Sequence, residues 1–129
     1  MEDFVTFEIA KKLKDKEFPQ RPDYFNYSSY YDWDGLRKIH SLSNASVWFD
    51  PNISRNNLYF APTISQTLKW LREEKNIILI LNPYFNEYCG VGWDCDVWIR
   101  GNYIHCCEDY KTYEEAAIAG IEYVLDNLI

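Results

Sequence analysis

An alternating stretch from Trp93 to Arg100 constrains the fold more than any other part of the sequence. Large apolar residues occupy every second position, and mostly polar or charged residues lie between them. Because successive side chains of a β-strand point to opposite faces of the sheet, this pattern predicts a strand with one buried and one mixed face. The buried set is Trp93, Cys95, Val97 and Ile99, and the mixed set is Asp94, Asp96, Trp98 and Arg100.

The two residues that follow, Gly101-Asn102, suit the turn of a β-hairpin. An antiparallel hairpin closed by this turn pairs Trp98 with His105, and Asp96 with Cys107. The same register brings four candidate metal ligands to the mixed face: Asp94, Asp96, His105 and Cys107. Scattered surface polar groups explain these residues as well, and their spacing matches no zinc module, so we predict no metal site.

Three segments have the start signals and the apolar spacing of amphipathic helices. Thr6 is a suitable N-cap for the first of them. Capping boxes open the other two, formed by Thr63 with Gln66 and by Thr112 with Glu115. We therefore predict helices over residues 7–17, 64–74 and 113–128.

Further strands are predicted from composition. The apolar run Ile77–Leu81 indicates a central strand buried on both faces, which Asn82-Pro83 would end. The aromatic-rich residues 24–40 predict a second hairpin, and residues 41–57 predict a loop with a short strand near 47–49.

Together these elements predict an α+β fold. A chain of 129 residues has the size of one ordinary domain, so we expect a single domain over residues 1–129. In this domain an antiparallel sheet of roughly four to six strands would be covered by the three helices.

Charge and hydropathy exclude several classes of protein. Twenty acidic against thirteen basic residues give a formal charge of −7, which repels phosphate backbones, so we expect no direct nucleic-acid partner. The longest apolar run, Ile77–Leu81, is far shorter than the ~20 residues of a membrane span. The N-terminus is acidic where a secretory signal would be basic, which predicts a cytoplasmic protein with reduced cysteines.

The order helix, three strands, helix from residue 63 onward also occurs in double-stranded RNA-binding domains. The terminal helix lacks the basic stripe that such a domain needs, because Ile121–Ile129 contains two acidic residues and no lysine or arginine. The order of elements is therefore only an analogy.

No residue pattern in the chain indicates catalysis. There is no C-x-x-C pair, no nucleophile elbow and no phosphate-loop lysine, and the adjacent Glu114 and Glu115 suit the first turn of a helix. We therefore predict no enzymatic activity, no catalytic residue and no cofactor.

Several segments carry a resemblance to a known family. They are Phe4–Lys14, Ala61–Gln66 with Lys69–Glu73, and Tyr113–Ala117 with Leu125–Ile129. Over nearly the whole chain, these segments resemble uncharacterised small proteins encoded by bacteriophages and mobile elements of gut bacteria of the Bacteroides group. The resemblance implies a phage or mobile-element accessory protein of the bacterial cytoplasm, and it transfers no catalytic residue.

Aromatic and acidic residues on a hydrophilic chain favour a non-enzymatic protein that acts by protein–protein interaction. The tentative interaction surface is Trp33, Trp48, Trp98, His105, Asp94 and Asp96. Core packing is the alternative for each tryptophan. We expect the partner to be an unidentified host or phage protein, and the chain itself to be a monomer or homodimer.

Two other functions stay open at this stage. An acidic chain is suited to imitate DNA and inhibit a host nucleic-acid-binding protein. A small metal-dependent hydrolase would instead use Asp94, Asp96, His105 and Cys107.

Overall fold

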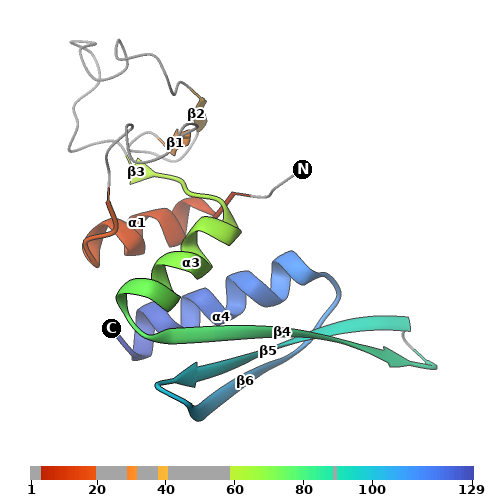
Figure 1. The fold of residues 1–129 in the computed structure, drawn as a ribbon. Helices are drawn as coiled ribbons and strands as arrows, with labels where there is room; N and C mark the ends of the chain where they lie inside the picture. Colours follow the sequence, from red (N-terminus) through yellow and green to blue (C-terminus); the bar gives the residue numbers. More distant parts are fainter. Residues whose placement is uncertain (1–3, 20–28, 32–37, 41–58, 89) are drawn as a thin grey trace, which may run out of the picture. The chain divides into compact units, whose positions relative to one another are not determined.

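The computed structural model of the chain is described for residues 4–19, 29–31, 38–40, 59–88 and 90–129 (Figure 1). The chain divides into two compact units, Phe4–Pro62 and Thr63–Ile129. The fold is α+β, and the described residues form three helices and six strands in two antiparallel sheets. That residues 1–129 form a single domain stays a prediction.

The N-terminal unit combines one helix with a small sheet. Helix α1 (Phe7–Asp15) begins where Ile9 N donates a hydrogen bond to Thr6 Oγ1 at 3.3 Å. Phe18, just beyond the helix, stacks on Phe60 with ring centroids 5.7 Å apart. The sheet has the order β2-β1-β3, formed by β1 (Ser29–Tyr31), β2 (Lys38–His40) and β3 (Tyr59–Phe60).

Two predictions for this unit are confirmed in part. The helix predicted for residues 7–17 is present and ends two residues earlier. The hairpin predicted within residues 24–40 is present as the antiparallel pair β1 and β2, although the connection over 32–37 lies outside the described residues. The predicted loop over 41–57, with its short strand near 47–49, also lies outside them.

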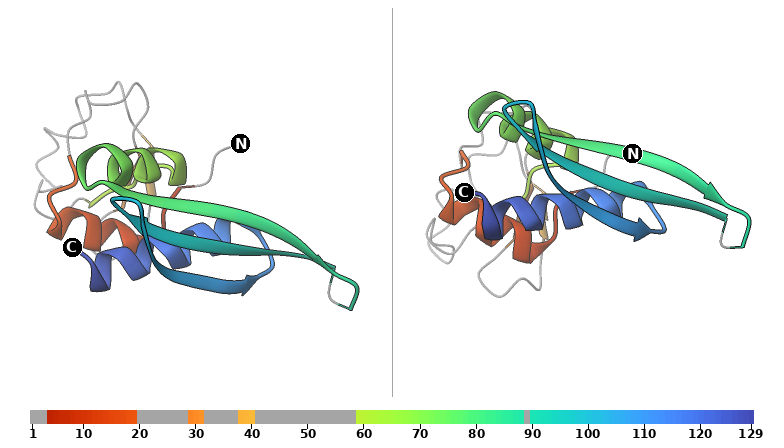
Figure 2. Two further views of the ribbon diagram at one scale, coloured as in Figure 1. Left: turned by 60° about the horizontal axis from the view of Figure 1, so that its bottom comes forward. Right: turned by 90° about the horizontal axis from the view of Figure 1, so that it is seen from below.

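The C-terminal unit is a three-stranded antiparallel sheet with two helices on one face (Figures 1 and 2). Helix α4 contacts all three strands, and helix α3 contacts β4 and α4. The sheet has the order β4-β5-β6, so β4 and β6 are its edges. The elements are α3 (Ile64–Glu74), β4 (Ile77–Asn86), β5 (Gly90–Ile99), β6 (Asn102–Tyr110) and α4 (Tyr113–Asn127).

Both helices of this unit begin at the predicted caps. Thr63 Oγ1 accepts from Gln66 N at 3.1 Å, and Thr63 N donates to Gln66 Oε1 at 2.8 Å, which completes a capping box. Thr112 Oγ1 accepts from Glu115 N at 3.1 Å, but the capping box predicted here is incomplete, because Glu115 Oε2 accepts from Lys111 N at 3.4 Å and not from Thr112 N. The helices predicted for residues 64–74 and 113–128 are therefore confirmed, the latter ending one residue early.

The core of the unit lies between α4 and the sheet. Cys95, Cys107 and Ala116 are buried there, and half-buried side chains such as Leu79 and Trp93 pack around them. Gly120 of α4 comes so close to β5 that a Cβ atom at this position would collide with Cys95 Sγ. This glycine allows the helix to approach the sheet.

Strand β4 differs from its prediction in two ways. It is an edge strand, not a central one, and Ile78 and Ile80 are 43% and 42% exposed instead of buried. It also continues through Asn82-Pro83 to Asn86. An edge strand tolerates proline, because an N–H directed away from the sheet makes no ladder hydrogen bond. The expected single sheet of four to six strands is instead two sheets of three among the described residues.

The register predicted for the hairpin of β5 and β6 is wrong. The turn is Arg100-Gly101, whose φ angles of +50° and +84° match a two-residue turn with two left-handed positions. Trp98 consequently lies opposite Tyr103, and a register shift follows before Val97 pairs with His105. The predicted register had placed His105 opposite Trp98.

Candidate interaction surface

The face of the three-stranded sheet opposite α4 is covered by no helix of the C-terminal unit (Figure 2). We call it the outer face. Its side chains alternate with the buried Cys95 and Val97, and cross-strand pairing groups them together. They are Ile78, Ile80, Asn82 and Tyr84 of β4, Asp94, Asp96 and Trp98 of β5, and Tyr103, Cys106 and Asp109 of β6.

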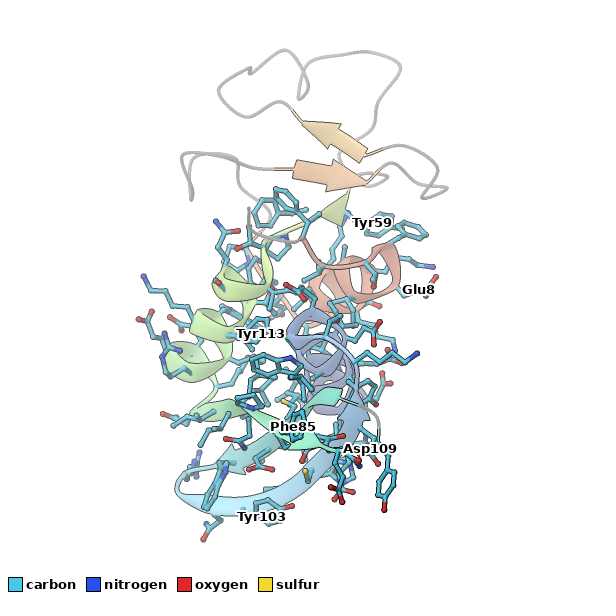
Figure 3. All side chains as sticks on the ribbon, turned by 90° about the vertical axis from the view of Figure 1, so that its right-hand side faces the viewer. Glu8, Tyr59, Phe85, Tyr103, Asp109 and Tyr113 are labelled. Atoms are coloured by element: carbon cyan, nitrogen blue, oxygen red, sulfur yellow. The ribbon has the colours of Figure 1, made fainter. Side chains whose placement is uncertain are left out.

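One half of the outer face is apolar. Ile78 and Ile80 line β4, and Trp98 lies beside them with its ring 5.5 Å from that of Tyr103 in an edge-to-face arrangement. Tyr103 is 54% exposed and lies on the side of the sheet away from the helices (Figure 3). Trp98 Nε1 is buried and has no hydrogen-bond partner among the described residues. Exposed aliphatic and aromatic side chains are thus contiguous here.

The other half of the outer face is acidic, and its carboxylates are held in place. Asp96 Oδ2 accepts from Asn82 Nδ2 at 2.8 Å. Asp94 Oδ1 accepts from the backbone N–H of Asp109 at 3.1 Å, where Asp109 has a φ of +67° next to a register shift. The two aspartates of β5 therefore project in fixed positions without a basic partner in these hydrogen bonds.

Tyr84 ties the three strands together across the acidic half. Its ring crosses the sheet directly over Gly92, where a Cβ atom would overlap the ring. Its hydroxyl donates to Asp109 Oδ1 at 2.6 Å. The absence of a side chain at Gly92 thus makes room for a contact between the two edge strands.

The cysteine beside this cluster is not activated. Burial, followed by a hydrogen bond to Asp96 and by the neighbouring carboxylates, raises the pKa of the Cys106 thiol to about 12. The reactive form of cysteine is the thiolate, so this thiol is protonated and unreactive at neutral pH. The same holds for Cys95, whose pKa is raised to about 12 mainly by burial.

A second exposed group lies at the tip of the β4–β5 hairpin, which extends past the end of α4 (Figures 1 and 2). Phe85 is 75% exposed and Tyr88 is 89% exposed. A shallow hollow is lined by the consecutive residues Tyr84 to Tyr88. This tip is distinct from the apolar half of the outer face, which lies at the opposite end of the hairpin.

The structure brings some predicted site residues together and separates others. Trp98, Asp94 and Asp96 share the outer face. His105 lies on the helix side, stacked on Tyr123 of α4 with ring centroids 4.0 Å apart. Trp33 and Trp48 lie outside the described residues.

The hypothetical metal cluster does not form. Cys107 is buried opposite Cys95 on the helix side, so neither it nor His105 converges with Asp94 and Asp96. In the described part of the chain, no group of three or more histidine, cysteine or acidic side chains is arranged to hold a metal ion. Cys106, not Cys107, is the cysteine beside Asp96.

The residues that make the surface apolar differ from those predicted from the sequence. Ile78 and Ile80 were expected to be buried, and Tyr103, Phe85 and Tyr88 were not singled out. Two aromatic residues in the tip of a hairpin were a usable signal, because turns ordinarily contain glycine, proline and small polar residues. No local sequence pattern predicts that Ile78 and Ile80 are exposed, because their exposure depends on which strand forms the edge of the sheet.

The negative charge of the chain is concentrated in the C-terminal unit. Eleven acidic and five basic side chains lie between Thr63 and Ile129, a formal charge of −6 out of −7 for the whole chain. The first turn of α4 contributes Glu114 and Glu115, where a phosphate-binding helix N-terminus would need to be free of acidic groups. The electrostatic field around this unit is therefore negative.

Among the residues that the structure describes, none of the helices combines the length and the hydropathy of a membrane-spanning helix. Comparison of the chain with protein-family models, with curated proteins and with solved structures finds no match.

Proposed function

We propose that this chain is a non-enzymatic accessory protein of a phage or mobile element, which acts in the bacterial cytoplasm by binding another protein through its outer face. The observation that carries the proposal is the composition of that face. Exposed Ile78, Ile80 and Tyr103 are contiguous with Trp98, and fixed carboxylates flank them. Exposed apolar patches with a polar rim are typical of protein-binding sites.

The partner surface is expected to match both halves of the outer face. Apolar side chains would cover the isoleucines and the Trp98–Tyr103 pair. Lysine or arginine side chains would pair with Asp94 and Asp96. A host or phage protein with a basic, partly apolar surface has this chemistry.

A more specific version of this function is that the chain imitates DNA and occupies a nucleic-acid-binding protein. The formal charge of −6 between Thr63 and Ile129 supports this alternative. So does the placement of Asp94, Asp96 and Asp109 on adjacent strands of one face. In this case duplex DNA and the chain would compete for the same partner.

The metal-dependent hydrolase is not proposed, because its four ligands lie on opposite faces of the sheet. Direct binding of double-stranded RNA is not proposed either. The α3-β4-β5-β6-α4 order has the same sequence of elements as that domain, but the acidic first turn of α4 opposes phosphate binding.

The test is capture of proteins from host lysate with the tagged chain, followed by mass spectrometry. The variant carries Trp98→Ser and Tyr103→Ser, which remove the aromatic pair of the outer face. The matched control is Phe85→Ser, because Phe85 is more exposed than Tyr103 but lies at the hairpin tip. Circular dichroism would verify that all versions fold.

We expect a protein that is retained by the parent and by Phe85→Ser and lost with the outer-face variant. Elution of that protein by a duplex oligonucleotide at constant salt would select the DNA-mimic version. Equal retention by the parent and the outer-face variant would overturn the assignment of the surface, and an empty capture would overturn the interaction itself.

A further inference from the structure

The apolar half of the outer face contains a row of three large side chains that crosses the whole sheet. Trp98 of β5 lies directly opposite Ile78 of β4 and directly opposite Tyr103 of β6. Ile78 and Tyr103 are exposed, so the row is accessible to another molecule. Contiguous apolar groups of this kind on a protein surface mark a site of association.

Charges of opposite sign lie on the two sides of this row. Arg100, in the turn two residues beyond Trp98, is exposed and is the only lysine or arginine from residue 76 to residue 110. Asp96 lies two residues before Trp98, and Asp94 lies two residues further along the same strand. Along β5 the order is therefore positive, apolar and negative, with equal spacing on either side of the tryptophan.

This order is complementary to itself when it is reversed. A two-fold axis that lies midway between two stacked sheets and crosses the strands at Trp98 sets each β5 antiparallel to the β5 of the other copy. The apolar row then packs on the same row of the second copy. Arg100 of each copy reaches the level of Asp96 of the other, and the two side chains together bridge the ~10 Å between stacked sheets.

We infer that the outer face pairs with the outer face of a second copy of the chain about this axis. The like charges that would oppose such a dimer lie far apart in it. The two copies of Asp94 are each four residues from the axis and at opposite ends, so about 27 Å separates them along the strands. This distance is well beyond the ~8 Å Debye length at physiological salt. Asp109, which is hydrogen-bonded to Asp94, is displaced in the same way.

The small size of the contact makes the dimer reversible. A few large side chains from each copy cover less than the ~800 Å² per partner that stable complexes bury, so we expect a dissociation constant in the micromolar range. A protein with higher affinity for the outer face would displace the second copy. In this respect the inference rests on the proposed function, because self-pairing regulates access to the same face. The pairing itself does not depend on another protein.

The test is the mass of the full chain by sedimentation velocity over a range of concentrations, with charges exchanged between the two contacting positions. One variant carries Arg100→Glu and the other carries Asp96→Lys. The matched control is Lys111→Glu, which makes the same change of charge as Arg100→Glu. Lys111 is also exposed, but it follows β6 at the opposite end of the sheet. Circular dichroism verifies that every version folds.

We expect the parent and Lys111→Glu to approach the mass of a dimer of the 15.4 kDa chain as the concentration rises. Each of the two variants alone should dimerise about tenfold more weakly, because two attractive pairs become repulsive. An equimolar mixture of Arg100→Glu and Asp96→Lys should recover the dimer, since glutamate then meets lysine and Arg100 meets Asp96. A parent that stays monomeric, a variant that dimerises as well as the control, or a mixture that associates no better than its components would each overturn the inference.

Capture from host lysate separates this inference from the proposed function. Arg100→Glu is expected to capture a partner at least as well as the parent does, because its outer face is uncovered, and weaker capture would contradict the regulation. An empty capture beside a confirmed dimer would overturn the proposed function and leave the pairing supported. A captured partner beside a monomeric parent would do the reverse.

Discussion

The two faces of the β4-β5-β6 sheet are made by alternate residues of the same strands, but they differ in how their side chains are packed and hydrogen-bonded. On the helix side, Cys95 and Val97 are fully buried, and Gly120 lets α4 approach. On the outer face, Ile80 is 42% exposed and the carboxylates are held by local hydrogen bonds. Packing on one face stabilises the fold, which leaves the other face available for binding.

The largest effect is expected from replacing the same residue type on each face of one strand. Ile77 is 1% exposed and faces the helix side, whereas Ile80 faces outward. Ile77→Ala is expected to lower the free energy of unfolding by about 3 kcal/mol, because it leaves a cavity in the core. Ile80→Ala is expected to change it by less than about 1 kcal/mol. Urea unfolding at low protein concentration measures both, and equal losses would contradict the contrast between the faces.

The next largest effect concerns the close approach of α4 to the sheet. Gly120→Ala places a methyl group against Cys95 Sγ and is expected to cost about 1–2 kcal/mol, although alanine favours the helix. Combining it with Cys95→Ala should restore part of the loss, since the colliding Sγ atom is removed. If urea unfolding gives the Gly120→Ala variant the same free energy of unfolding as the parent, α4 does not pack closely against β5.

A smaller effect is expected from raising the pH. Burial raises the pKa of the Cys95 thiol to about 12, against about 8.5 for an exposed cysteine. Between these values the unfolded chain releases a proton that the folded chain retains, so stability is full below pH 8.5 and falls as the pH rises. The contribution of this thiol is at most about 1.4 kcal/mol per pH unit. Urea midpoints between pH 7.5 and 9.5 should therefore fall less steeply for Cys95→Ala than for the parent.

The smallest effect is expected from the contact that crosses the outer face. Tyr84→Phe removes the hydrogen bond to Asp109 but keeps the ring over Gly92, and is expected to cost about 0.5–1 kcal/mol. A double-mutant cycle with Asp109→Asn isolates the coupling between the two side chains. A coupling energy near zero would show that the hydroxyl and the carboxylate do not interact in solution.

Local signals in the sequence were sufficient for the helices and for the faces of β5. Thr63 and Thr112 cap their helices as their spacing predicts, because a capping interaction involves only neighbouring residues. The alternation from Trp93 to Ile99 also assigned the buried Cys95 and Val97 correctly.

The register of the β5–β6 hairpin and the position of β4 in its sheet depend on non-local interactions, and both were predicted incorrectly. Gly101 suits a turn in either of two positions, and the choice of Arg100-Gly101 together with a register shift places His105 and Cys107 on the helix side. A one-residue slip moves a side chain to the other face, which separated the candidate metal ligands. The exposure of Ile80 depends on β4 being an edge, which no pattern within β4 encodes.

The crossing of Tyr84 over Gly92 has a consequence for how this surface changes in evolution. Any side chain at position 92 would displace the tyrosine ring, and loss of the ring would remove the hydroxyl that binds Asp109. Substitutions at these three positions are therefore tolerated as a set, not one at a time. Among descendants of this chain, residues 84, 92 and 109 should covary although they lie on three different strands.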